Sequence, residues 1–107
     1  MALPNCPIET TLSTIKGKWK PLIILYLMNG PMRFEELKKK IGPISQKVLT
    51  EQLREMENYG LVIRKVYAKI PPHVEYSLSE IGYSLQSVFD ALEQWGNNYK
   101  KLYDKQK

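Results

Sequence analysis

Residues 45–59 carry a row of polar side chains that could hydrogen-bond a nucleic acid. Lys47, Thr50, Glu51 and Arg54 follow the spacing i, i+3, i+4, i+7, and Gln46 lies beside them in the first turn. On a helix this spacing places them on one face. Lysine, threonine, glutamine and arginine are side chains that bind base edges or phosphate oxygens. The same pattern also fits an ordinary solvated helix face, so the neighbouring elements have to decide between the two.

The rest of the chain offers little other chemistry. It has one histidine and one cysteine in 107 residues, which gives no metal-ligand cluster. It has no Gly-rich phosphate loop and no nucleophile beside a base, so we expect no enzyme, no metal and no cofactor. The formal net charge of +5 favours a polyanionic partner, which would be nucleic acid or a lipid surface.

Length and hydropathy indicate a single domain over residues 1–107. The longest apolar run, PLIILYLM, is far shorter than a membrane span, so we expect no membrane insertion. The first ten residues lack the basic start and apolar run of a signal peptide. We therefore expect a cytoplasmic protein.

Apolar spacing and Gly/Pro punctuation predict helices at about 7–16, 19–28, 33–41 and 45–59. In the fourth, Ser45 is the expected N-cap, and Leu49, Leu53 and Met56 form the expected buried seam. Residues 61–79 predict two strands joined by a Pro-containing loop. A last helix should start near Ser79 and continue to about residue 101 or beyond.

This order of elements predicts a mainly α, α+β fold with a β-hairpin. Two short helices joined by a few residues are typical of a helix-turn-helix, and a hairpin directly after them is typical of a wing. In such a fold the N-terminal part of the second helix enters the major groove of DNA. The context therefore favours DNA contact over a solvated face for residues 45–59.

Several segments together resemble a known family. They are CPIE, GKWK, GPMRFEEL, ISQKVLTEQLREM, GLVIRKVY and PPHVEYSLSEIG. The chain, from Cys6 to about Gly96, resembles the HxlR-type winged helix-turn-helix transcriptional regulators, which are MarR-like. The resemblance implies a bacterial homodimer that binds double-stranded DNA as a repressor or activator. It also implies dimer contacts in the first and last helices.

The candidate DNA-binding residues lie in the helix-turn-helix and the wing at about 65–75. Those expected to face the groove are Ser45, Gln46, Lys47 and Thr50, whereas Arg54 and Arg33 should reach phosphates, and Lys65 and Lys69 belong to the wing. Lys18 and Lys20 flank Trp19 and fit either phosphate contacts or a solvated face.

Two further sets of residues suggest assembly and regulation. The candidate dimer interface is Leu12, Leu92, Trp95, Tyr99 and Leu102, the alternative being a last helix folded back onto its own domain. Cys6 precedes Pro7 at the start of the first helix, where the helix end favours a thiolate. It is a candidate redox sensor, or a partly buried structural residue, and a small-molecule effector is the other source of a signal.

The alternative function is a winged-helix module that contacts proteins and has no specific DNA site. The basic charge and the polar face of residues 45–59 count against it. Weak salt dependence of any nucleic-acid binding would favour it.

Overall fold

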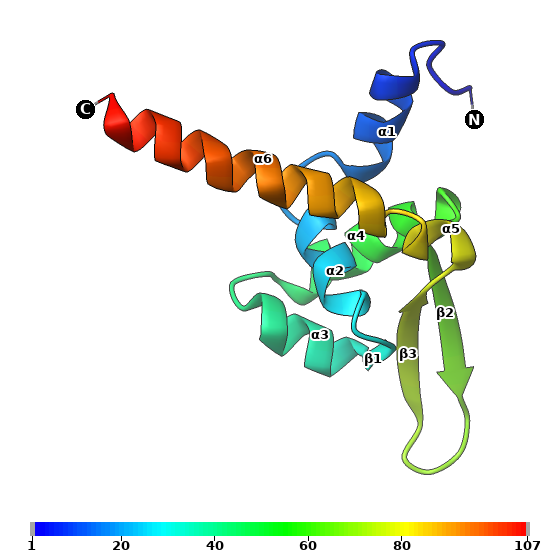
Figure 1. The fold of residues 1–107 in the computed structure, drawn as a ribbon. Coiled ribbons are helices and arrows are strands. Elements are labelled where there is room, and N and C mark those ends of the chain that lie inside the picture. Colours follow the sequence, from blue (N-terminus) through cyan, green and yellow to red (C-terminus); the bar gives the residue numbers. More distant parts are fainter. Residues whose placement is uncertain (1, 107) are drawn as a thin grey trace.

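A computed structural model of the chain describes residues 2–106 and shows six helices and three strands among them (Figure 1). The elements are α1 (Pro7–Ile15), α2 (Lys20–Leu27), β1 (Met32–Arg33), α3 (Phe34–Ile41), α4 (Gln46–Asn58), β2 (Val62–Tyr67), β3 (His73–Leu78), α5 (Glu80–Tyr83) and α6 (Gln86–Lys105). The α+β class and the predicted order of helices, hairpin and helix are confirmed.

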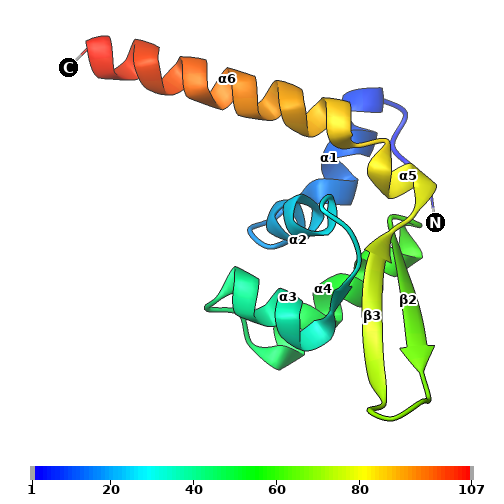
Figure 2. The same ribbon diagram turned by 60° about the horizontal axis from the view of Figure 1, so that its bottom comes forward.

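The sheet is antiparallel with strand order β1-β3-β2. Strands β2 and β3 form the predicted hairpin, which extends away from the helices as a wing (Figure 2). Strand β1 was not predicted. It pairs Met32 with Tyr76 and Arg33 with Glu75, and its two residues are too few to show an alternating pattern.

The core lies between α2, α3, α4 and the inner face of the sheet. The predicted seam of α4 is confirmed, because Leu49, Leu53 and Met56 are fully buried. Ser45 caps this helix as expected, since its Oγ accepts a hydrogen bond from the Val48 amide at 3.1 Å. Ile44 is also buried, so both ends of the short connection from α3 are fixed.

The prediction of one continuous terminal helix is wrong, because the structure divides this segment into two helices, α5 and α6. Ser79 caps α5 by accepting a hydrogen bond from the Gly82 amide at 3.0 Å. The helix ends one turn later, and α6 begins after Ser84 and Leu85 in a new direction (Figure 1). Close packing of Gly82 against Leu61 and Leu78 holds α5 at the base of the wing.

Helix α6 projects from the body and lies far from the tip of the wing (Figure 1). The radius of gyration is 15.8 Å and the longest dimension is 56 Å. A compact chain of this length would have a radius of gyration of about 13 Å. None of the helices within residues 2–106 is long and apolar enough to cross a membrane.

Candidate nucleic-acid interface

Helix α4 turns its buried seam to the core and its polar face to solvent. Gln46, Lys47 and Arg54 are exposed, and Thr50 is half-buried between them. Together with Glu51 they line a shallow hollow along the outer surface of the helix. The predicted polar face therefore exists as one continuous surface on a single helix.

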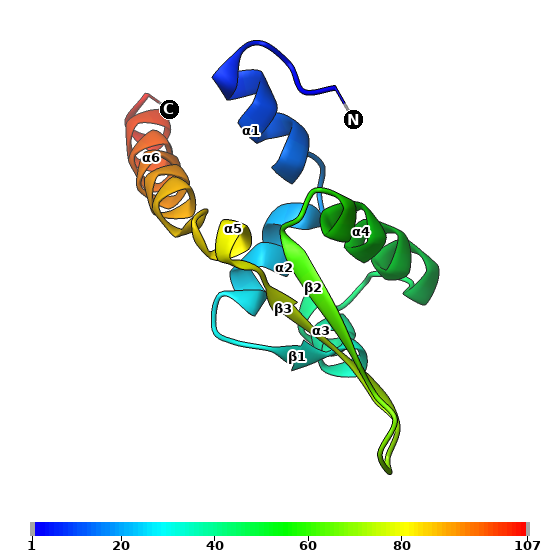
Figure 3. The same cartoon turned by 90° about the vertical axis from the view of Figure 1, so that its right-hand side faces the viewer.

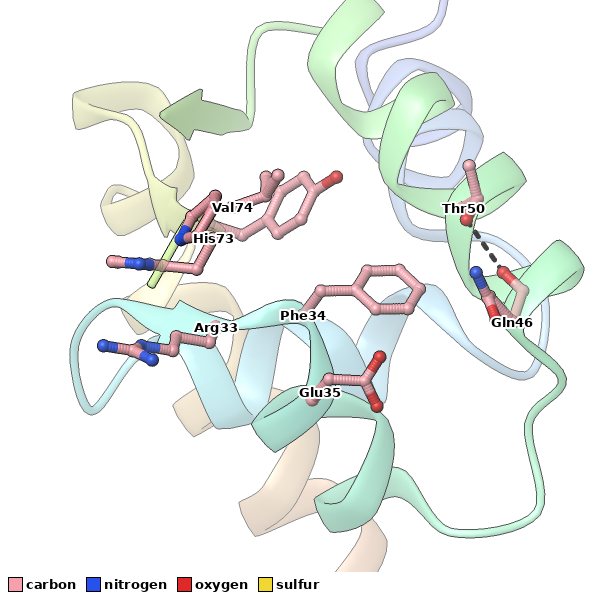
Figure 4. Close-up of a pocket in the computed structure, with 9 residues that line it drawn as sticks. Arg33, Phe34, Glu35, Gln46, Thr50, His73 and Val74 are labelled. Carbon is pink, nitrogen blue, oxygen red and sulfur yellow. Dashed lines mark hydrogen bonds between the residues drawn. The ribbon is translucent and has the colours of Figure 1, made fainter. Parts of the chain in front are cut away.

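The first turn of this face is held by a local hydrogen bond. The Thr50 hydroxyl donates to the Gln46 carbonyl oxygen at 2.8 Å (Figure 4). With its hydrogen used inside the helix, the Thr50 oxygen is available mainly as an acceptor. The Ser45 Oγ already accepts the hydrogen bond from the Val48 amide that caps the helix.

A groove of about 480 Å³ separates the N-terminal half of α4 from the wing. The half-buried Phe34 ring lies at its centre, with its centroid 6.3 Å from that of Tyr76 (Figure 4). The residues that line the groove are Arg33, Phe34, Glu35, Gln46, Thr50, Pro72, His73, Val74 and Tyr76. The groove thus joins the start of α3, the start of α4 and the returning strand of the wing.

Arg33 lies at the border of this groove and ends β1. Its amide donates to Glu36 Oε1 at 2.9 Å, which closes the first turn of α3. Its side chain is exposed and points away from Gln46 (Figure 4). Arg33 is therefore placed outside the polar face of α4, on the same side of the sheet as its strand partner Glu75.

The two predicted wing lysines occupy different places. Lys69 is exposed in the loop between β2 and β3. Lys65 pairs with Glu75 in the ladder, and its ammonium lies 4.9 Å from the centroid of the Tyr67 ring. Tyr67 in turn stacks on His73 at 4.6 Å. Lys65 thus lies on the sheet face opposite to that of Tyr76.

Arg64 is a basic wing residue that the sequence did not single out. It pairs with Tyr76, whose ring is buried and borders the groove. Burial raises the pKa of Tyr76, and the nearby charges of Arg64 and Arg54 act against that rise while Glu57 adds to it. These residues come from the C-terminal half of α4 and from β2 and β3, and α4 packs against β2 (Figure 3).

Neither predicted role of Lys20 fits the structure. Its side chain is only 6% exposed, and its Nζ forms an ion pair with Glu55 Oε2 at 2.6 Å. The start of α2 packs under the C-terminal half of α4, so this ammonium faces inward and reaches neither phosphates nor open solvent. Lys18 remains exposed, with its Nζ 4.6 Å from the centroid of the Trp19 ring.

Cys6 and the predicted dimer residues lie at the opposite end of the molecule from the wing tip. Cys6 is exposed at the N-cap of α1. The exposed fractions of the predicted dimer residues, Leu12, Leu92, Trp95, Tyr99 and Leu102, are 49–67%. Helix α6 does not fold back onto its own domain (Figure 3). Within residues 2–106, no three His, Cys, Asp or Glu side chains gather to hold a metal ion.

This arrangement, two short helices followed by a hairpin wing, has clear relatives. The family model of HxlR-like helix-turn-helix proteins matches residues 14–104. The chain belongs to this family. It is similar to two HTH-type transcriptional regulators of Bacillus subtilis (strain 168). Identity to YdeP is 47% over 101 residues (94% of this chain and 79% of YdeP), and identity to YkvN is 50% over 95 residues (89% and 80%).

The solved structures agree with the sequence relatives of this HxlR-like chain. It is 39% identical to the redox regulator HypR in its reduced form, with a TM-score of 0.85 over 94% of this chain and 99% of HypR. The HxlR-like protein is thus a winged helix-turn-helix transcriptional regulator, and the family implies that it binds DNA. Helix α4 occupies the position of the recognition helix and β2–β3 that of the wing.

Proposed function

We propose that this chain acts as a homodimer that reads a pseudo-palindromic DNA operator through α4 and the wing. The observation that carries the proposal is the continuous polar face of α4, which opens onto the groove beside the wing. An α-helix fits the major groove of B-DNA, and the wing would then lie along the adjacent backbone or minor groove.

The residue roles follow from position along α4 and the wing. Gln46, Lys47 and Thr50 would face base edges near the start of the helix, with Ser45 beside them. The residues assigned to the DNA backbone are Arg33, Arg54 and Lys69, whereas Lys65, which pairs with Glu75 on the outer face of the wing, is assigned no contact. Base contacts specify the sequence, whereas phosphate contacts fix the position and orientation of the protein.

The dimer proposal is supported by α6. Phe89 is the last buried residue in the part of the chain that the structure describes, so the rest of α6 extends beyond the core. An isolated helix of about 15 residues is only marginally stable in water. Its exposed ring stack of Trp95, Tyr99 and Tyr103, with centroids 5.3 and 5.8 Å apart, offers an apolar surface for a second copy.

Selection of bound duplexes from a random DNA pool tests the operator directly. For a dimer we expect a pseudo-palindrome with half-sites about one helical turn, ~34 Å, apart. If the protein is folded but the bound pool stays random, it binds DNA only through non-specific charge attraction. That result would contradict sequence-specific binding. It would favour a module that contacts proteins instead.

Substitutions in α4 and β1 separate base reading from phosphate contact. Gln46→Ala and Lys47→Ala should reduce discrimination between operator and random duplex, because one base contact contributes roughly 1–3 kcal/mol. Arg33→Ala should weaken both duplexes alike and lower the salt slope by about one unit for each bound protomer. Equal losses on both duplexes for all three variants would overturn the base-reading assignment.

Sedimentation at several concentrations tests the dimer. Trp95→Glu and Leu102→Glu each place a charge on the exposed stripe of α6 without touching the core, so both should give monomers that remain folded. Lys100→Glu on the same helix is the charge control. A monomeric unmodified chain at micromolar concentration would contradict the homodimer.

Cys6 is proposed as the redox sensor. It is exposed at the N-cap of α1, and the structurally similar HypR is described as a redox regulator. A peroxide would convert the thiol to a sulfenic acid, with the peroxide reduced to water or alcohol. Peroxide treatment should change operator affinity for the unmodified chain and leave Cys6→Ser unaffected. The same response in both proteins would exclude Cys6 as the sensor.

A further inference from the structure

Two arginines lie where the recognition helix meets the wing. Arg54 belongs to the exposed face of α4, and Arg64 lies near the base of β2. Paired residues in neighbouring strands project on the same face of a sheet. Arg64 pairs with Tyr76 and therefore leaves the sheet on the face of Tyr76, whereas the next residue, Lys65, leaves it on the opposite face with Glu75.

Helix α4 also carries a carboxylate, Glu57, with one oxygen unsatisfied. Glu57 Oε1 is buried and has no hydrogen-bond partner among the described residues. Buried polar atoms are normally paired, and a buried carboxylate oxygen without a donor is costly. The charges of Arg64, Glu57 and Arg54 all act on the Tyr76 hydroxyl. A guanidinium has five N–H donors and is well suited to satisfy such an oxygen.

We propose that Arg54 and Arg64 form a binding site for one backbone phosphate of the DNA strand that passes between α4 and the wing. In this site Glu57 is a positioning residue: its Oε1, which has no partner in the structure, would accept a hydrogen bond from one edge of the Arg64 guanidinium when DNA is bound. The other edge remains free for phosphate, because the planar fork of arginine can bind oxygens on two sides. The inference rests on the proposed function, since it requires α4 and the wing to engage the same duplex.

The junction between α4 and the wing is a place where a DNA backbone would have to pass. Helix α4 would lie in the major groove and the wing along the adjacent groove, so a phosphate backbone must cross the junction between them. Arg54 approaches this junction from α4 and Arg64 from β2. Their charges exceed that of Glu57, so the cluster keeps a net positive charge for an anion.

The test measures affinity by fluorescence anisotropy over a series of salt concentrations, on the selected operator and on a random duplex of equal length. Arg64→Gln should lower the salt slope by about 0.9 for each bound protomer on both duplexes. At about 0.15 M salt this corresponds to a loss of roughly fivefold in affinity per protomer, and about 25-fold for a dimer. Lys65→Gln is the matched control, with the same charge change one residue away, and should stay within about twofold of the unmodified chain.

The positioning role of Glu57 needs its own readout. Glu57→Gln removes a negative charge near DNA, so electrostatics alone would strengthen binding. We expect it to weaken binding several-fold in the unmodified chain and to have no further effect in the Arg64→Gln background. Stronger binding by Glu57→Gln, or equal effects in both backgrounds, would overturn this role. Circular dichroism and urea midpoints confirm that each variant is folded.

The outcomes separate this inference from the function on which it rests. If the unmodified chain shows no salt-dependent DNA binding, the proposed function fails. If it binds the operator but Arg64→Gln behaves like Lys65→Gln, the phosphate site alone is wrong. A loss confined to Lys65→Gln would show that the outer face of the wing contacts DNA instead.

Discussion

Replacing Gly82 by alanine should separate α5 from the base of the wing. A Cβ at this buried position would lie 2.3 Å from the Leu61 carbonyl oxygen. It would also lie 3.1 Å from both Cβ and Cδ2 of Leu78. The Leu61 oxygen already accepts a hydrogen bond from the Ser79 amide at 2.9 Å, so it is fixed at the start of β2. The clash is with backbone and with a buried side chain, and neither can rotate away.

The expected cost follows from the displacement. A carbon normally stays about 3.3 Å or more from a carbonyl oxygen, so α5 would have to move by about 1 Å. Overpacking of a core typically costs 1–3 kcal/mol, and losing the Ser79 hydrogen bond adds about 0.5–1.5 kcal/mol. We therefore expect Gly82→Ala to lower the free energy of unfolding by roughly 2–4 kcal/mol.

The matched control is the same substitution at Gly96 in α6, where a Cβ would meet nothing within 4 Å. Alanine is favoured over glycine inside a helix by about 0.5–1 kcal/mol, so Gly96→Ala should raise stability. Urea unfolding followed by circular dichroism gives both values, at one fixed protomer concentration because a dimer's stability depends on it. A Gly82→Ala protein within about 0.5 kcal/mol of the unmodified chain would refute the close-packing argument.

Three further predictions concern single contacts. Ser45→Ala removes the side-chain cap of α4 and should cost about 1 kcal/mol in urea unfolding, whereas Ser87→Ala on the exposed surface of α6 should not. Glu55→Gln leaves the buried Lys20 ammonium without its carboxylate, so it should lower the urea midpoint more than Lys20→Met, which removes the charge itself. Burial raises the pKa of Tyr76 above 10.0, so its contribution to stability is complete below pH 10 and is lost as pH rises through the folded-state pKa. Unfolding of Tyr76→Phe should therefore depend less on pH above 10.

The sequence predicted α4 well because several independent signals coincide there. The capping serine, the apolar seam and the polar face each specify the same helix, and the buried Leu49, Leu53 and Met56 confirm which face of it points inward.

The terminal helix shows the opposite case. Its apolar spacing continues through residues 81–89, so nothing periodic marks the end of α5. The interruption is imposed by tertiary packing of Gly82 against the wing, which spacing alone does not reveal.

Lys20 shows the same limit for a charged residue. A lysine beside a tryptophan at a helix start reads as a surface residue, because lysine is almost never buried unless it is paired. Its partner, Glu55, lies 35 positions away on α4 and is itself 55% exposed. The pairing depends on how α2 crosses α4, and this crossing is not encoded in any local pattern.

The wing shows how one residue of register decides a functional assignment. Val74, Tyr76 and Leu78 alternate with polar residues along β3, and Tyr76 and Leu78 are buried. Which residues of β2 share that face depends on the length and turn of the loop at 68–72. A shift of one residue would move Lys65 to the face of Tyr76 and Arg64 to the opposite face. With Val62 opposite Leu78 and Arg64 opposite Tyr76, the register places Arg64 on the face of Tyr76. Comparing Arg64→Gln with Lys65→Gln therefore tests the register and the phosphate site in one experiment.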